Sequence, residues 1–333
     1  MIRRFSLLPL VFAFTATTSA QGWAPVASGT VEVLADVHFL SSTVGFAVAD
    51  GGLLLSTTDG GDSWSSRVLN AGLDNQGIAF SPSGATGAIV TDDGGVLRST
   101  DAGVSWSFVP TGMNDGRAAI AWASESVVWV AGRDGNAAMS VNAGATWTSR
   151  PSGSAERTEG MAAAGSSMAW VVGRSGEIRR TTDAGVTWVP QTSGVSADLR
   201  DIQMLDASVG YIAGNNNTVL KTTNGGATWT NVATSGVSGN GLFFLDANTG
   251  WVVADAGQIW HTANGGASWS LQPSGTTQSF NRVHFPGPSA GFAVGDAGAV
   301  VRFTSGTTGV EGGAGNADAS LRVGPTRPRE RPQ

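Results

Sequence analysis

The chain has 333 residues, of which 48 are glycine, 12 are tryptophan and none is cysteine, and its formal charge is −6. Hydrophobic residues make up 41% of the sequence and charged residues 13%, which is enough apolar material for a large core and excludes a wholly disordered chain. The negative charge argues against a nucleic-acid binder that works through a broad basic face. Without cysteine, the chain has no disulfide bond, thiolate metal site, thiol nucleophile or lipidated-cysteine anchor.

The first twenty residues have the pattern of a secretory signal. Arg3 and Arg4 precede an apolar run over residues 5–14, and small residues end the segment at Ala20. This run is shorter than the roughly 20 apolar residues that a membrane-spanning helix needs. We therefore expect residues 1–20 to direct export, the mature chain to lie in the periplasm, at the cell surface or outside the cell, and no segment to span a membrane.

Six segments with the pattern [ST]-x-[DN]-x-G-x-[ST]-W, here called the repeat turns, recur with a spacing of 40 to 42 residues. Their Asp or Asn can fold onto the backbone of a tight turn, the Gly two residues later takes a conformation that other residues resist, and the Trp packs between layers. Asn replaces Asp in three copies, which favours a structural role over calcium binding or catalysis. The six pairs are Asp59 and Trp64, Asp101 and Trp106, Asn142 and Trp147, Asp183 and Trp188, Asn224 and Trp229, and Asn264 and Trp269.

Between the repeat turns, each unit of about 41 residues contains an apolar strand, a second strand with an aromatic residue, a polar turn and a third strand, and a fourth strand follows the Trp. Four short strands per unit are typical of a propeller blade. The sequence therefore predicts an all-β fold, a seven-bladed β-propeller of four-stranded antiparallel blades, over residues 21–304.

The ends of the repeat predict how the ring closes. Trp23 lies 41 residues before Trp64, at the position of a repeat Trp, whereas the seventh unit has no repeat turn after Thr304. We therefore expect the N-terminal strand to join the last blade, which removes the open edge of the ring. Residues 305–333 are rich in Gly, Pro and Arg, and we expect them to form a flexible tail.

The repeat turns match the Asp-box, also called the bacterial neuraminidase repeat. The longer unit from Leu199 to Trp229 resembles the photosystem II stability/assembly factor-like propellers, and the resemblance covers nearly all of residues 22–304. It implies a non-enzymatic assembly factor that holds a membrane-protein precursor through an arginine-lined surface. Sialidases, oligoxyloglucan-type glycosidases and sortilin-like receptors share the Asp-box, so the fold alone does not define the activity.

A carbohydrate-active propeller, which binds or hydrolyses glycans, is the alternative. A sialidase needs a Tyr nucleophile, but the one Tyr of the chain, Tyr211, lies where other units have packing aromatics. Asp36, Glu159 and Asp201 lie at the starts of the innermost strands. They could supply a pair of glycosidase acids, or Asp36 and Asp201 could bond local backbone, which we favour. We therefore expect no catalytic residue.

Two further groups of side chains bear on the choice between these hypotheses. His38 and His284 occupy equivalent positions in the first and seventh units, which become neighbours on closure. Two imidazoles without a third ligand are more typical of packed histidines than of a metal site, so we expect neither a metal nor a cofactor. Trp122 and Trp260 are candidates for exposed aromatic side chains, which would favour glycan binding.

Charged residues are unevenly distributed over the loops that we expect on one face of the propeller. Units one, two, six and seven present the acidic residues Asp50, Asp92, Asp93, Asp255 and Asp296. Units three to five present the arginines Arg117, Arg133, Arg157, Arg174 and Arg200. A basic sector on a rigid scaffold suits an acidic or carboxylate-bearing peptide, including a membrane-protein segment, and a merely solvated rim is the other interpretation. We therefore predict a monomeric scaffold that binds a protein partner and no nucleic acid.

Overall fold

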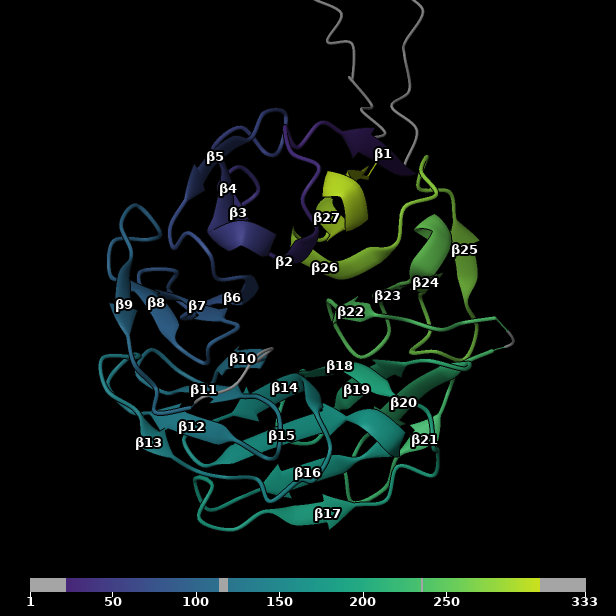
Figure 1. Ribbon diagram of the computed structural model, residues 1–333. Coiled ribbons are helices and arrows are strands. Elements are labelled where there is room, and N and C mark those ends of the chain that lie inside the picture. Colours follow the sequence, from purple (N-terminus) through teal and green to yellow (C-terminus); the bar gives the residue numbers. More distant parts are fainter. Residues whose placement is uncertain (1–21, 114–118, 235, 306–333) are drawn as a thin grey trace, which may run out of the picture. The chain divides into compact units, whose positions relative to one another are not determined.

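The structure is a computed structural model that describes residues 22–113, 119–234 and 236–305. Over these residues the chain forms seven four-stranded antiparallel sheets around a common axis, with the first strand of each unit innermost (Figure 1). The predicted fold, an all-β seven-bladed propeller, is therefore confirmed. Helical structure in the described ranges is limited to four 3-10 turns, and none has the length and apolar character that a membrane crossing requires: η1 (Asp50–Gly52), η2 (Arg174–Gly176), η3 (Asp255–Gly257) and η4 (Asp296–Gly298).

Each of the first four blades follows the chain from its inner to its outer strand. The first contains β2 (Leu34–Phe39), β3 (Gly45–Ala49), β4 (Leu53–Thr57) and β5 (Ser65–Val68). The second contains β6 (Asn75–Phe80), β7 (Gly87–Thr91), β8 (Val96–Ser99) and β9 (Ser107–Val109). The third contains β10 (Ala119–Trp122), β11 (Val128–Ala131), β12 (Ala137–Ser140) and β13 (Thr148–Ser149). The fourth contains β14 (Thr158–Ala164), β15 (Met168–Gly173), β16 (Ile178–Thr181) and β17 (Val189–Gln191).

The last three blades bring the chain back to its beginning. The fifth contains β18 (Leu199–Met204), β19 (Gly210–Gly214), β20 (Thr218–Thr222) and β21 (Thr230–Asn231). The sixth contains β22 (Gly241–Phe244), β23 (Gly250–Val253), β24 (Ile259–Thr262) and β25 (Ser270–Gln272). The seventh contains β26 (Phe280–Gly287), β27 (Ala290–Gly295), β28 (Val300–Thr304) and, as its outer strand, β1 (Gly22–Val26).

The ring closes through β1, as the sequence predicts. Strand β1 pairs antiparallel with β28, and Trp23 lies opposite Phe303. The Trp23 side chain is only 7% exposed and packs edge-on against Phe285 at a centroid distance of 5.7 Å. Its indole nitrogen donates a hydrogen bond of 2.8 Å to Gln272 Oε1 in the sixth blade. The first strand of the chain is therefore held both by its own sheet and by the preceding blade.

The repeat turns connect the third and fourth strands of the blades. In the fourth blade, Asp183 Oδ1 accepts hydrogen bonds from the Thr187 amide at 2.9 Å and from the Thr181 hydroxyl at 2.8 Å. Ala184 and Gly185 follow with φ values of +58° and +77°. A Cβ on Gly185 would come within 3.0 Å of the buried Trp129 ring of the third blade, so only glycine fits there. The turn thus packs directly on the neighbouring blade.

Asn serves in the repeat turn as well as Asp because both side chains accept the same backbone bond. Asn142 Oδ1 accepts a hydrogen bond of 2.9 Å from the Thr146 amide, and Asn142 Nδ2 donates one of 2.8 Å to the Thr146 hydroxyl. In the fourth blade the hydroxyl of Thr187 is instead the donor, to Asp183 Oδ2. Where Asp is present, hydrogen bonds from the following Ser or Thr hold its pKa at about 2. These aspartates are Asp59, Asp101 and Asp183.

Candidate functional site

Five of the innermost strands have, as their second residue, one that breaks the regular pairing. In five blades the register with the second strand shifts there, so that one residue is a β-bulge and its side chain is turned out of the sheet. All five bulged residues line one cavity of about 340 Å³, and they are Ala35, Gln76, Glu159, Arg200 and Asn281. Residues from opposite sides of the ring can meet in this way only at the axis. The cavity is therefore the mouth of the central channel.

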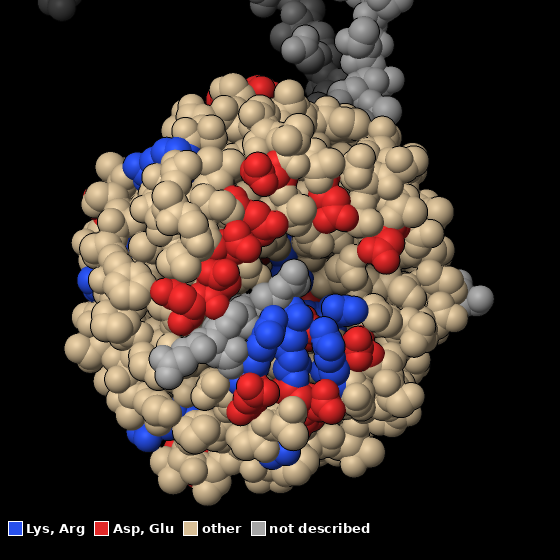
Figure 2. All heavy atoms as spheres, in the orientation of Figure 1, with Lys and Arg blue, Asp and Glu red and all other residues tan. Residues whose placement is uncertain are grey.

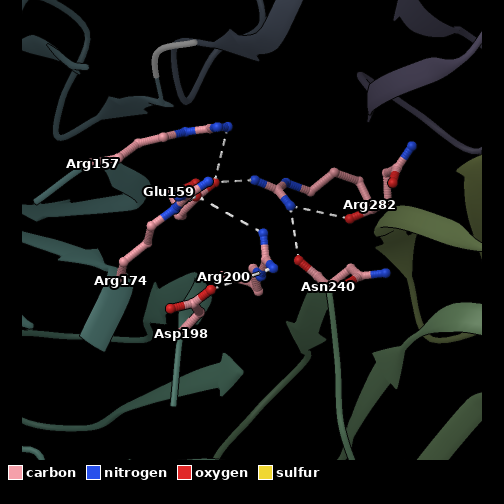
Figure 3. Close-up of polar contacts among 8 residues, drawn as sticks. Arg157, Glu159, Arg174, Asp198, Arg200, Asn240 and Arg282 are labelled. Carbon is pink, nitrogen blue, oxygen red and sulfur yellow. Dashed lines mark hydrogen bonds and ion pairs between the residues drawn. The ribbon is translucent and has the colours of Figure 1, made fainter. Parts of the chain in front are cut away.

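Four arginines, here called the arginine cluster, surround Glu159 (Figure 3). Arg157, Arg200 and Arg282 line the cavity with it, and Arg174 lies beside them. Arg157 Nη2 lies 3.2 Å from Glu159 Oε2, Arg174 Nε lies 3.3 Å from Oε1, and Arg200 Nη1 lies 3.9 Å from Oε1. Arg282 Nη2 donates to the backbone carbonyl of Glu159 at 3.4 Å. The Glu159 side chain is 8% exposed, so its carboxylate lies at the floor of the cluster.

Arg282 reaches the cluster from the opposite side of the channel. It belongs to β26 in the seventh blade, whereas Glu159 belongs to β14 in the fourth (Figure 3). Its Nη1 also donates to the backbone carbonyls of Asn240 at 2.9 Å and Asn281 at 3.1 Å. Burial lowers the pKa of Arg282, but the nearby carboxylates of Asp201 and Asp36 outweigh this effect and raise it. This guanidinium is therefore a fixed positive charge that connects three blades.

Asp36 and Asp201 use both carboxylate oxygens on backbone amides. Asp36 accepts from Val37 at 2.8 Å and from Ile78 of the next blade at 2.9 Å. Asp201 accepts from Ile202 at 2.9 Å and from Leu242 of the next blade at 3.0 Å. Burial raises the pKa of Asp36 to about 6, and burial also raises that of Asp201. The two carboxylates thus join neighbouring innermost strands, the arrangement that the backbone-bonding interpretation describes.

The predicted basic residues occupy three different situations. Arg157, Arg174 and Arg200 are brought together in the arginine cluster. Arg133 is exposed in the turn between β11 and β12, and Arg117 lies outside the described residues. Figure 2 shows basic side chains gathered beside the channel opening and acidic side chains in an arc over another part of the same face.

Sequence reasoning missed Arg282, which reaches the cluster from the seventh blade. The signal was available in the repeat, because Asp36, Asp201 and Arg282 all occur one residue before the apolar anchor of their innermost strand. A charged residue at that repeat position points into the channel in all three blades. A search of that single repeat position for charges would have found Arg282.

His38 and His284 are neighbours in the channel, with ring centroids 4.6 Å apart. His284 Nδ1 accepts a hydrogen bond from the Phe39 amide at 3.3 Å. Burial lowers the pKa of His38 to about 4 and that of His284 well below its usual value, so both rings are neutral at neutral pH. In the described ranges no three His, Cys, Asp or Glu side chains are grouped as metal ligands.

The aromatic candidates pack within and between blades. Tyr211 is fully buried, stacks on Phe244 at a centroid distance of 3.6 Å, and donates 2.7 Å to the carbonyl of Ala247. The idea that Trp122 and Trp260 are exposed is wrong. Both are half-buried, because one side of each ring packs against a hydrophobic cluster of buried residues.

The fold and the site define the class of protein, a repeat propeller with a charged site at the mouth of its channel. A family model described as photosynthesis system II assembly factor YCF48 matches residues 15–114 and 184–271, which is more than half of the sequence. The chain belongs to this family. The predicted kinship with photosystem II assembly factor-like propellers is therefore confirmed.

Solved structures support the same fold. A structure of YCF48 bound to D1 peptide is 20% identical with a TM-score of 0.72, and the match covers 86% of this chain and 98% of that one. YCF48 from Cyanidioschyzon merolae is 19% identical with a TM-score of 0.68, covering 85% and 98%. The WD40 β-propeller domain of Doa1 is 11% identical with a TM-score of 0.71, covering 87% and 98%. No curated protein matches the sequence.

Proposed function

We propose that this chain is an exported, non-enzymatic scaffold that binds a protein partner as an assembly or stability factor, and that the partner docks an acidic or carboxylate-bearing segment on the arginine cluster. Membership of the YCF48 family supports a protein-binding role, and a similar structure is of YCF48 with a D1 peptide bound. The basic and apolar pattern of residues 1–20 supports export. The predicted signal, residues 1–20, and residues 306–333 of the predicted tail lie outside the described residues.

The arginine cluster is the observation that carries the proposal. Four guanidinium groups meet there, together with the carboxylates of Glu159 and Asp198. The carboxylates of Asp36 and Asp201 lie near Arg282 and offset its charge. Arg174 is 47% exposed and Arg200 31% exposed at the edge of the cavity. Planar guanidinium groups bind carboxylates in pairs, and complementary charge also speeds the encounter of two proteins.

The carbohydrate-active alternative has less support. Its paired acids would be Asp36 and Asp201, whose oxygens are occupied by backbone amides. Its aromatic platforms would be Trp122 and Trp260, which are half-buried. The observations therefore favour a peptide over a glycan at the channel mouth.

Replacing Arg174 with glutamate tests the site. The change reverses one charge of the cluster and sets a second carboxylate beside Glu159, so the affinity for fluorescein-labelled hexaglutamate is expected to fall at least about tenfold in fluorescence anisotropy. Capture of a native envelope protein, identified by mass spectrometry, is expected to fall in parallel. Arg133→Glu makes the same charge change on an exposed arginine outside the cluster and is expected to have a much smaller effect. Equal affinities for wild type and Arg174→Glu would contradict the proposed site.

A further inference from the structure

Glu159 is held by several weak contacts and by no single strong one. Its oxygens lie 3.2, 3.3 and 3.9 Å from nitrogens of Arg157, Arg174 and Arg200. Tight charge-assisted N–H···O pairs are typically about 2.7–2.9 Å long, so each of these contacts is loose. The two more exposed members of the cluster, Arg174 and Arg200, therefore retain capacity to bind a second anion after Glu159 has been accommodated.

Two guanidinium groups of the cluster are much more exposed than the carboxylate that they surround. Glu159 is 8% exposed, whereas Arg174 is 47% and Arg200 is 31% exposed. A carboxylate that enters the cavity must therefore approach the same nitrogens from the open side, with the carboxylate of Glu159 beneath it. Two like charges that share one set of donors repel each other. The repulsion is strong here because the site is partly shielded from water.

Glu159 is the carboxylate that the guanidinium groups of Arg157, Arg174 and Arg200 share. Arg200 also has Asp198 at 3.6 Å, whose side chain is 33% exposed, and Arg282 has Asp36 and Asp201 nearby. Glu159 lies at the bulge of β14, which turns its side chain to the centre of the group. In the free protein, the Glu159 carboxylate thus pairs with the guanidinium groups that the partner's carboxylate would contact in the complex.

We propose that Glu159 is a resident competitor in the arginine cluster: its carboxylate occupies the guanidinium groups in place of the partner's carboxylate and thereby limits the affinity, so that the bound segment can be released. This inference rests on the proposed function of the same site. In this inference, Glu159 sets the affinity and the dissociation rate of the bound segment. The arginines remain the groups that contact the ligand.

The test compares Glu159→Gln with wild type, using fluorescein-labelled hexaglutamate and the full chain. Glutamine keeps the size of the side chain and one oxygen acceptor but removes the competing charge, so the affinity is expected to rise roughly tenfold, mainly through slower dissociation. Stopped-flow dissociation measures the rate directly. Glu159→Asp keeps the charge but withdraws it by one methylene, and it is expected to give a smaller rise even if the glutamine variant fails to fold.

Asp198→Asn is the matched control, since it removes the same charge from a more exposed carboxylate that pairs with one arginine only. Its effect is expected to be clearly smaller than that of Glu159→Gln. Equal gains in affinity for the two variants would show a general effect of net charge and would overturn the proposal that Glu159 competes with the ligand. Unchanged or weaker binding by folded Glu159→Gln, while Arg174→Glu still weakens binding, would overturn it and leave the proposed function intact. Hexaglutamate binding that responds to neither residue would overturn the proposed function itself.

Discussion

Replacing Trp23 with alanine is expected to lower the free energy of unfolding by about 3–5 kcal/mol, the range found for large buried aromatics. Trp23 is 7% exposed, packs on Phe285 and Phe303, and donates a hydrogen bond to Gln272. Its loss leaves a cavity at the place where the two ends of the ring meet, and Gln272 Oε1 keeps only the hydrogen bond of 3.2 Å from Trp251 Nε1. Urea unfolding followed by circular dichroism measures the change.

Val31→Ala is the control for the closure. Val31 is 81% exposed in the segment that follows β1, so its truncation is expected to change stability by less than about 0.5 kcal/mol. A Trp23→Ala variant as stable as Val31→Ala would show that β1 does not close the ring.

Arg282→Met is expected to destabilise the propeller by about 3–5 kcal/mol at pH 7, because breaking a buried charge pair leaves uncompensated charge. The charges left behind are the carboxylates of Asp36 and Asp201. Burial already raises the pKa of Asp36 from 3.8 to about 6, and loss of the guanidinium raises it further. In the folded state these carboxyl groups would then take up protons.

The loss of stability is therefore expected to depend on pH. A carboxyl whose folded pKa exceeds its unfolded value stabilises the fold at low pH, and this contribution is lost as the pH rises from about 4 through the folded pKa. Arg282→Met is expected to be closest to wild type near pH 4–5 and furthest from it at pH 7. Urea unfolding at pH 5, 6 and 7 measures this. Arg302→Met, which removes a partly exposed arginine paired with Asp62, is the control and should show little pH dependence. The same small loss at every pH for Arg282→Met would contradict the role of Arg282.

The blades could be predicted from the sequence because each one repeats the same local chemistry. The repeat turn needs an acceptor side chain, two residues with positive φ and a Trp, and these requirements are visible in any single copy. Closure could be predicted because Trp23 lies one repeat spacing before Trp64 without a repeat turn of its own, whereas the last unit ends at Thr304 without a repeat turn or Trp. Both inferences depend on local patterns and on counting.

The arginine cluster could be predicted only in part. Arg157, Arg174 and Arg200 belong to neighbouring blades, so their position along the chain suggests that they meet. Arg282 comes from a blade that the charge pattern assigns to the acidic sector, and it contacts Glu159 across the axis, 123 residues away. The bulges that turn Glu159 and Arg200 inward arise from pairing in the folded sheet, which no local pattern reveals. Arg133 was predicted with the other arginines, but it lies apart from them in the exposed turn between β11 and β12.

Photo-crosslinking tests most directly whether the partner docks at the arginine cluster. A benzoylphenylalanine side chain at Ser175, exposed beside Arg174 in η2, probes the channel mouth, and the same group at Val186, which is 70% exposed in the repeat turn of the same blade, probes the opposite face. Irradiation in a native envelope extract is expected to give a covalent adduct with a captured protein from position 175, lost on adding Arg200→Glu, and none from position 186. An adduct with the same protein from position 186 and none from position 175 would contradict the account.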